Sequence, residues 1–278
     1  MNSTPSHNCR TADPSPTLSA GRGKRPVFPG AGRLIMKTKA KIQNGRGKPV
    51  KSARVIIPAA SANPSFPVIA MAASAGGLKA LSVILGGLPE DFPAAITIVM
   101  HLAPAHKSLL AEILNNRTHL AVKEAGTGDV LRPASVFIAP PNHHLFVTQG
   151  GRLRLSSSVS EKVHYARPSA EPLFASVARI YKKNAIGVVL TGGDGDGSFG
   201  VRIIKEQGGK VIAQDRPTSQ DFSMPETSIN TGEVDFILPL NEIAPKLIAL
   251  AGDINRQKSE PAGLKIARQD SHKKQAHG

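Results

Sequence analysis

The chain has 278 residues, of which 40% are hydrophobic and 20% charged, and its formal net charge at pH 7 is +15. This length suits one α/β domain or two small domains with a substantial core, and the single cysteine, Cys9, excludes a disulfide framework and any metal site built from several cysteines. No apolar run approaches the roughly 18–20 residues of a membrane span and no signal-peptide core follows the N-terminus, so we expect a soluble, cytoplasmic protein without a transmembrane segment.

The N-terminal residues 1–65 are predicted to form a disordered basic arm. Residues 1–60 hold 12 Lys/Arg against one acid and are rich in Ser, Pro and Gly, a composition that buries too little apolar surface to offset the entropy of ordering. A solvated tail, a weak contact with a polyanion or membrane surface, and an over-extended start all fit this arm. Residues 61–252 hold 17 basic and 16 acidic side chains, so the net charge is not evidence for a nucleic-acid-binding domain.

Residues 66–252 are predicted to form one domain, followed by a flexible C-terminal tail over 253–278. Short continuous apolar runs, typical of strands buried on both faces, alternate with segments of helical apolar spacing. In chain order we expect strand 67–72, helix 78–88, strand 95–100, helix 107–117, strand 135–139, hairpin 145–155, helix 170–183, strand 185–190, helix 199–207, strand 210–214, helix 226–230, strand 235–238 and helix 242–250. The pattern indicates an α/β fold: a doubly wound, mostly parallel sheet with helices on both faces, plus a small hairpin.

Three kinds of polar side chain follow three of the expected strands. Ser74 follows the first strand, His101 follows the second, and Asp196 lies in the glycine-rich loop 192–198. Ligands of a doubly wound sheet bind beyond the carboxyl ends of its strands, so these side chains are expected at one site. A hydroxyl, an imidazole and a carboxylate are the set that nucleophilic hydrolysis needs, and the neighbouring glycines would let backbone N–H groups approach a substrate oxygen.

Each of these residues also has a simpler interpretation. Ser74 could be the N-cap of a helix, or its turn could hold a phosphate, although no phosphate-binding motif is present. His101 could be a structural hydrogen-bonding residue. A calcium loop beginning at Asp194 is excluded, because its sixth and twelfth positions hold Phe199 and Lys205 in place of Gly and Glu.

Two other classes of site are disfavoured. His143, His144 and His164 have no partner at metal-ligand spacing, so we expect loop histidines and no metal. The nucleophile elbow of α/β-hydrolases is absent, because Ala72 stands where that motif has its first glycine.

Six short segments together form a more specific pattern than any one of them. They are Ala72–Gly77, Met100–Pro104, Phe137–Pro140 with His144-Leu145, Arg167–Ser169 with Leu173-Phe174, Leu190–Gly197, and Met224-Pro225. In this order and spacing they resemble the catalytic domain of the CheB family of protein-glutamate methylesterases, over residues 68–252.

The resemblance implies a serine hydrolase that removes methyl esters from glutamyl side chains of methyl-accepting chemotaxis receptors, with glutamine deamidation as a second activity. By position, Ser74 matches the nucleophile, His101 the general base and Asp196 the orienting carboxylate. The N–H of Gly193 matches an oxyanion donor, and Ala75 and Met224 match the loops around the substrate. No cofactor is implied. The receptors would be protein substrates within a phosphorelay signalling system, with a separate response regulator or methyltransferase as a further partner.

The chain departs from the family pattern at several points. Ala75 replaces a common Thr, Gly193 a common Met, and Gly195 an Asn or Ser, so the loop is expected to be more mobile and the rate lower. The basic arm stands where the family carries a phospho-receiver domain. We therefore expect a stand-alone esterase whose activity does not rise with a small phosphodonor. The alternatives are a catalytically idle domain that binds receptors or signalling partners, and a serine hydrolase for another ester or amide.

Overall fold

The computed structural model describes residues 65–101, 108–157, 163 and 166–259. All of these fall within one compact unit of the chain. The predicted arm, apart from Ser65, and residues 260–278 lie outside the described residues. In the described part of the chain, no helix is both long and apolar enough to cross a membrane.

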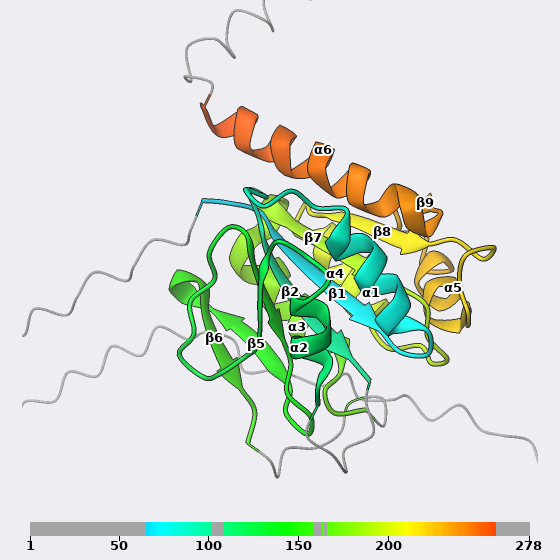
Figure 1. The fold of residues 1–278 in the computed structure, drawn as a ribbon. Coiled ribbons are helices and arrows are strands. Elements are labelled where there is room, and N and C mark those ends of the chain that lie inside the picture. Colours follow the sequence, from blue (N-terminus) through cyan, green and yellow to red (C-terminus); the bar gives the residue numbers. More distant parts are fainter. Residues whose placement is uncertain (1–64, 102–107, 158–162, 164–165, 260–278) are drawn as a thin grey trace, which may run out of the picture. The chain divides into compact units, whose positions relative to one another are not determined.

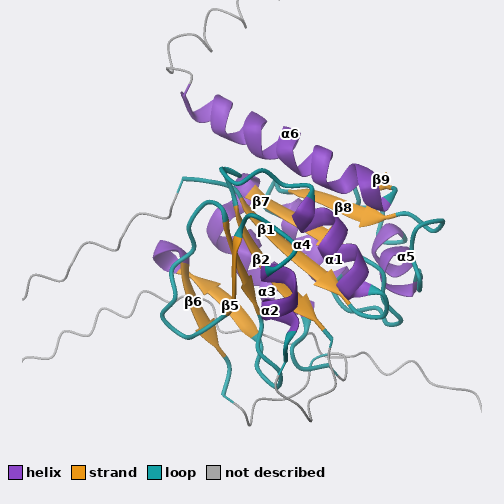
Figure 2. Cartoon of the chain, viewed as in Figure 1, coloured by secondary structure: helices purple, strands orange, loops and turns teal. Residues whose placement is uncertain are grey.

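A seven-stranded sheet forms the centre of the described fold (Figures 1 and 2). Its strands, in spatial order, are β3 (Ala121–Glu124), β4 (Ser135–Ile138), β2 (Ala95–Met100), β1 (Val68–Ala73), β7 (Ala185–Val189), β8 (Lys210–Gln214) and β9 (Phe236–Leu238). All six pairings between these neighbours are parallel. A separate antiparallel hairpin pairs β5 (Leu145–Thr148) with β6 (Arg152–Leu155).

Helices cover both faces of the sheet because its central strands are apolar on both sides. In β1, Ile69 and Met71 belong to one buried cluster, and Val68 and Ala70 belong to the other. The first cluster includes side chains of α1 (Gly77–Gly86), α2 (Leu110–Asn115) and α6 (Leu240–Ser259). The second includes side chains of α3 (Ala170–Tyr181), α4 (Ser198–Glu206), α5 (Ser223–Ile229) and the hairpin. The predicted fold class is thus confirmed.

Two elements differ from the prediction. The edge strand β3 was not predicted, because three of its four residues are exposed and it has no apolar run. Helix α6 continues to Ser259, past the point near residue 253 where the sequence predicted a flexible tail. That prediction was wrong for 253–259, because the polar composition hides an apolar contact: Ile254 packs against the first cluster.

The strand order places the predicted site residues at neighbouring strand ends. From β1 the sheet extends through β2 in one direction and through β7 in the other, so β1 lies at the switch in strand order. Ala73 is paired with Met100, and Ala72 is paired with Val189. The residues after β1, β2 and β7 therefore meet at the carboxyl edge of the sheet, where ligands of such folds bind.

Candidate active site

Ser74 follows β1 directly, and its backbone N–H is held by a hydrogen bond. Its N–H donates a hydrogen bond to the carbonyl of Thr191, at 2.9 Å. The N-cap of α1 is Gly76, which has a φ of +79° and no side-chain cap, so the N-cap interpretation of Ser74 is wrong. Among the described residues, no hydrogen bond involves the Ser74 hydroxyl.

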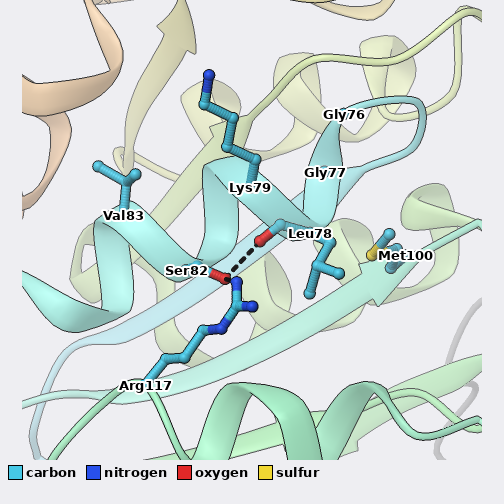
Figure 3. Close-up of a pocket in the computed structure, with 8 residues that line it drawn as sticks. All are labelled: Gly76, Gly77, Leu78, Lys79, Ser82, Val83, Met100 and Arg117. Carbon is cyan, nitrogen blue, oxygen red and sulfur yellow. Dashed lines mark hydrogen bonds between the residues drawn. The ribbon is translucent and has the colours of Figure 1, made fainter.

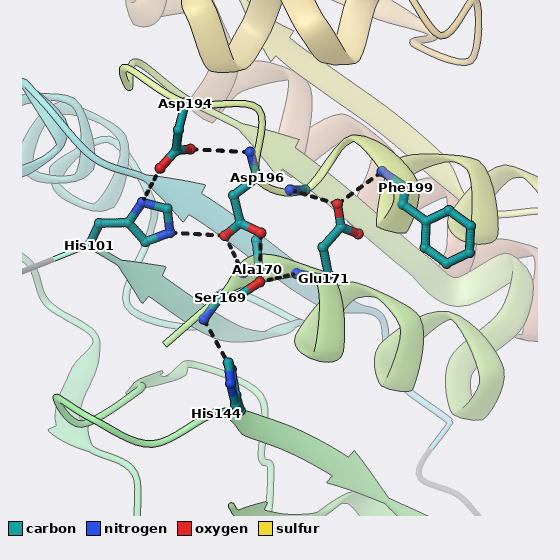
Figure 4. Close-up of polar contacts among 9 residues, drawn as sticks. His101, His144, Ser169, Ala170, Glu171, Asp194, Asp196 and Phe199 are labelled. Atoms are coloured by element: carbon teal, nitrogen blue, oxygen red, sulfur yellow. Dashed lines mark hydrogen bonds and ion pairs between the residues drawn. The ribbon is translucent and has the colours of Figure 1, made fainter. Parts of the chain in front are cut away.

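His101 directly follows β2, just as Ser74 directly follows the neighbouring strand β1, and the last residues of the two strands are paired. Its N–H donates to the carbonyl of Ala73, at 3.1 Å. Its imidazole lies between two carboxylates of the loop after β7 (Figure 4). The distance from Nε2 to Asp196 Oδ2 is 2.9 Å, and that from Nδ1 to Asp194 Oδ2 is also 2.9 Å. The structure thus joins His101 to Asp196, but within the described residues it does not join His101 to Ser74.

Asp196 is completely buried and is held by three donors. Oδ1 accepts a hydrogen bond from Ser169 Oγ at 2.6 Å, and Oδ2 accepts from the N–H of Ala170 at 2.5 Å as well as from His101. The N–H of Ser169 in turn donates to Nδ1 of His144, at 3.2 Å. This positioning role of Ser169 and His144 was not predicted, although both lie in segments that carried the family resemblance.

Glu171, another residue that the sequence analysis did not single out, fixes the loop that carries Asp196. It is buried in the first turn of α3 and accepts hydrogen bonds from the N–H groups of Gly197 and Phe199, each at 3.0 Å, and from that of Gly200. These donors belong to the N-terminus of α4, whose first N–H groups have no partners within the helix. The carboxylate also matches the positive end of the helix dipole.

We expect Glu171→Gln to lower the free energy of unfolding by roughly 2–3 kcal/mol, because one carboxylate oxygen becomes an NH₂ group that faces backbone N–H donors. Glu112→Gln is the matched control, since Glu112 lies in the first turn of α2 and is exposed. Its expected cost is below about 0.5 kcal/mol. Urea unfolding of the two variants measures both values, and equal costs would contradict this role.

Backbone donors are available beside Ser74. Ala75 and Gly193 are both exposed, and neither N–H takes part in a hydrogen bond within the described residues. Gly192 packs tightly below them, because a Cβ there would lie 2.1 Å from Met224 Sδ and 2.8 Å from Ser74 Cβ. Met224 is itself fully buried, and its N–H donates to the carbonyl of Gly192 at 2.9 Å. Met224 thus packs against Gly192 and supports the loop after β7.

The two carboxylates determine the charge of His101. Burial by itself lowers the pKa of the imidazole, but hydrogen bonds and Coulombic attraction from Asp194 and Asp196 outweigh burial and raise the pKa to about 9. At neutral pH His101 is therefore an imidazolium in this arrangement, with both ring nitrogens acting as donors.

This raised pKa predicts a stability that depends on pH. The paired imidazolium stabilises the fold fully below the unfolded pKa of 6.5, and this contribution is lost as the pH rises through about 9. Between about pH 6 and pH 9.5 we expect the wild type to lose on the order of 2 kcal/mol more than His101→Gln, allowing for screening at the partly exposed Asp194. Urea unfolding at both pH values measures the difference, and parallel losses in the two proteins would contradict it.

The histidines considered as metal ligands take other partners. His143 Nδ1 is 2.9 Å from the carbonyl of Pro141, and His144 accepts from Ser169 as described above. His164 lies outside the described residues. In the described ranges, no group of three or more His, Cys, Asp or Glu side chains is arranged to hold a metal ion.

Comparison with known proteins shows the family to which the chain belongs. The family model of the CheB methylesterase matches residues 69–247. The chain belongs to the CheB methylesterase family. A protein of Cupriavidus metallidurans named protein-glutamate methylesterase/protein-glutamine glutaminase 2 is 36% identical over 249 residues, which cover 88% of this chain and 71% of that protein.

Two further CheB-family relatives and one solved structure give the extent of the similarity. Proteins of the same kind from Moorella thermoacetica and Anaeromyxobacter dehalogenans are 40% and 44% identical over 67% and 63% of this chain. The chain spans about half the length of these two relatives, at 45% and 51%. The crystal structure of the Thermotoga maritima CheB methylesterase catalytic domain matches with a TM-score of 0.64 and 37% identity, over 67% of this chain and 100% of that one.

A hollow of about 450 Å³ adjoins the candidate site of this CheB-family chain (Figure 3). Its lining is mostly apolar and includes Gly76 and Gly77, which follow Ser74 closely, and Met100, which precedes His101. Arg117 closes one side, where its guanidinium donates to Ser82 Oγ at 3.0 Å. The hollow therefore offers a mostly apolar surface with two cationic side chains, Lys79 and Arg117, beside the exposed loop after β1.

Proposed function

We propose that this chain is a protein-glutamate methylesterase that hydrolyses methyl esters of glutamyl side chains in methyl-accepting chemotaxis receptors. The observation that supports it most is the hydrogen bond between His101 Nε2 and the buried Asp196, formed at the strand end next to Ser74. The names of the relatives support both this activity and glutamine deamidation. We assign the activity to residues 66–252 and place it in the cytoplasm.

In the proposed reaction Ser74 is the nucleophile and His101 the general base. The Ser74 oxygen attacks the ester carbonyl while Nδ1 of a neutral His101 takes the hydroxyl proton. The C–O bond to the methoxy group then breaks, and the imidazolium returns the proton so that methanol leaves. Water, deprotonated by His101, hydrolyses the glutamyl-enzyme and releases glutamate and Ser74.

The other groups of the site assist these steps. Asp196 orients the imidazole and stabilises its positive charge, since its carboxylate is buried and fixed by Ser169 and Ala170. The N–H groups of Ala75 and Gly193, which take part in no hydrogen bond among the described residues, are the donors that would stabilise the oxyanion. Hydrolysis of the glutamyl methyl ester needs no metal in this scheme.

A catalytically idle receptor-binding domain is the second candidate. It is favoured by one observation: within the described residues, no hydrogen bond joins Ser74 to His101. An idle domain would bind receptor without turnover, whereas the esterase releases methanol.

The test is methanol release from methylated receptor in membranes, measured with the full chain. Ammonia release from receptor that carries glutamine at the same positions is measured in parallel. If the chain is an esterase, methanol release is lost in Ser74→Ala and kept in Ser135→Ala. Ser135 is the first residue of β4 and so lies at the amino ends of the parallel strands, away from Ser74 at their carboxyl ends. Receptor binding with equal, background release in all three proteins would establish the idle domain.

A further inference from the structure

The ring nitrogen of His101 that must accept the Ser74 proton in the proposed reaction already contacts another side chain. Asp196 takes Nε2 of His101, so Nδ1 is the only ring nitrogen that can accept the Ser74 proton. In the structure Nδ1 instead lies 2.9 Å from Asp194 Oδ2 (Figure 4). A nitrogen that donates to a carboxylate carries a proton and cannot accept a second one.

Asp194 is held in place for this contact by its own loop. Its Oδ1 accepts a hydrogen bond from the N–H of Asp196, at 3.1 Å, which closes a local turn and directs Oδ2 toward the imidazole. The Asp194 side chain is 41% exposed, whereas that of His101 is 14% exposed and that of Asp196 is buried. Asp194 is therefore the partner of His101 that an incoming substrate can reach and displace.

The charges around the imidazole favour this arrangement. Within the described residues, Asp194 and Asp196 are the charged groups in contact with His101. Asp221, from the loop after β8, is a neighbour of Asp194: hydrogen bonds from Ser223 lower the pKa of Asp221, and the charge of Asp194 opposes that shift. His144 lies beside Ser169, whose N–H donates to its Nδ1 (Figure 4). Two carboxylates thus face one imidazole, and both hydrogen bonds are strongest when it is an imidazolium.

We propose that Asp194 is a positioning residue that competes with Ser74 for Nδ1 of His101 and keeps the base protonated until substrate displaces the carboxylate. The proposal rests on the proposed function, since it assigns Nδ1 as the base. The proposal goes beyond that function because it makes the contact between Asp194 and His101 inhibitory in the resting site. Turnover then requires Asp194 Oδ2 to leave Nδ1, and the proton on Nδ1 to pass to solvent, before Ser74 can be activated.

The direct test is a histidine NMR titration of the full chain with ¹⁵N-labelled imidazoles, in which His101 is assigned by its loss in His101→Gln. In the wild type we expect both ring nitrogens of His101 to be protonated at neutral pH and to titrate near pH 9. Asp194→Asn keeps the acceptor for the Asp196 N–H, and we expect it to lower this midpoint by about one pH unit or more. Asp194→Ser is the second variant, because its hydroxyl keeps the turn but is too short to reach His101.

Asp91→Asn is the matched control. Asp91 is exposed in the loop between α1 and β2, so this variant is expected to leave the midpoint of His101 unchanged.

The second readout is the pH profile of methanol release. In both Asp194 variants the rising limb of kcat/KM shifts to lower pH, and the rate near pH 7 rises roughly tenfold or more as more His101 becomes neutral.

The outcomes separate the two proposals. An unprotonated Nδ1 in the wild type at neutral pH, or a midpoint that is the same in the wild type and both Asp194 variants, overturns the role of Asp194. A purely structural role would lower the rate of the Asp194 variants at every pH without moving the limb, and this result also overturns it. Absence of methanol release in every protein refutes the proposed function, and the titration still decides whether Asp194 holds the proton on Nδ1.

Discussion

Ser74→Ala is expected to lower methanol release on the order of 10⁴–10⁶-fold while leaving the fold unchanged. The loss is large because the hydroxyl is the attacking group of the proposed reaction and no other described side chain at the end of β1 can replace it. Stability is expected to change little, since the hydroxyl makes no hydrogen bond within the described residues. Rates under single-turnover conditions, together with urea unfolding, measure the two effects separately.

Ser135→Ala controls for the loss of a serine hydroxyl as such. Ser135 Oγ donates to the carbonyl of Arg132 and accepts from the N–H of the same residue, so its removal is expected to reduce stability slightly without affecting the rate. The two variants should therefore show opposite patterns of rate and stability. A Ser74→Ala protein with the wild-type rate would show that hydrolysis does not use this hydroxyl.

The central sheet was predictable because its strands are buried on both faces. Val68–Ala73 and Ala95–Met100 are apolar at every position except Thr97, so each is a continuous apolar run in the sequence. Strand β3 carries no such signal, because its edge position leaves Lys123 and Glu124 in solvent. The last turns of α6 are similarly hidden in a polar stretch, since only one side of that helix packs on the domain.

The sequence allowed the location of the site residues at the strand ends to be predicted, but not the contacts between their side chains. The rule that parallel strands end at a common edge brings Ser74, His101 and the loop after β7 together. Which carboxylate then contacts which ring nitrogen depends on the conformation of that loop, and the sequence contains two aspartates, Asp194 and Asp196, two positions apart. The supports from Ser169 and Glu171 come from another helix, and their pairing with the loop requires the tertiary fold.

Asp196→Asn tests the charge of the orienting group with little change in shape. The amide oxygen can still accept from Ala170 and from Nε2 of His101, while the NH₂ group faces Ser169 Oγ, which is able to accept after its hydroxyl rotates. The hydrogen bonds are thus retained, but the negative charge that stabilises the imidazolium is lost. We expect kcat to fall on the order of 10²–10⁴-fold, with KM changed far less, because the charge acts when the imidazolium forms in the transition state.

Asp235→Asn is the matched control for removal of a paired carboxylate. Asp235 accepts from Lys205 at 2.6 Å, from Lys210 at 3.0 Å and from the N–H of Val211 at 2.8 Å, but it precedes β9 and so lies at the opposite edge of the sheet from His101. This variant is expected to unfold at lower urea concentration and to keep the wild-type kcat. If Asp196→Asn also lost stability but kept its rate, Asp196 would be a structural anchor of the loop, and His101 would need no carboxylate on Nε2 to act as the base.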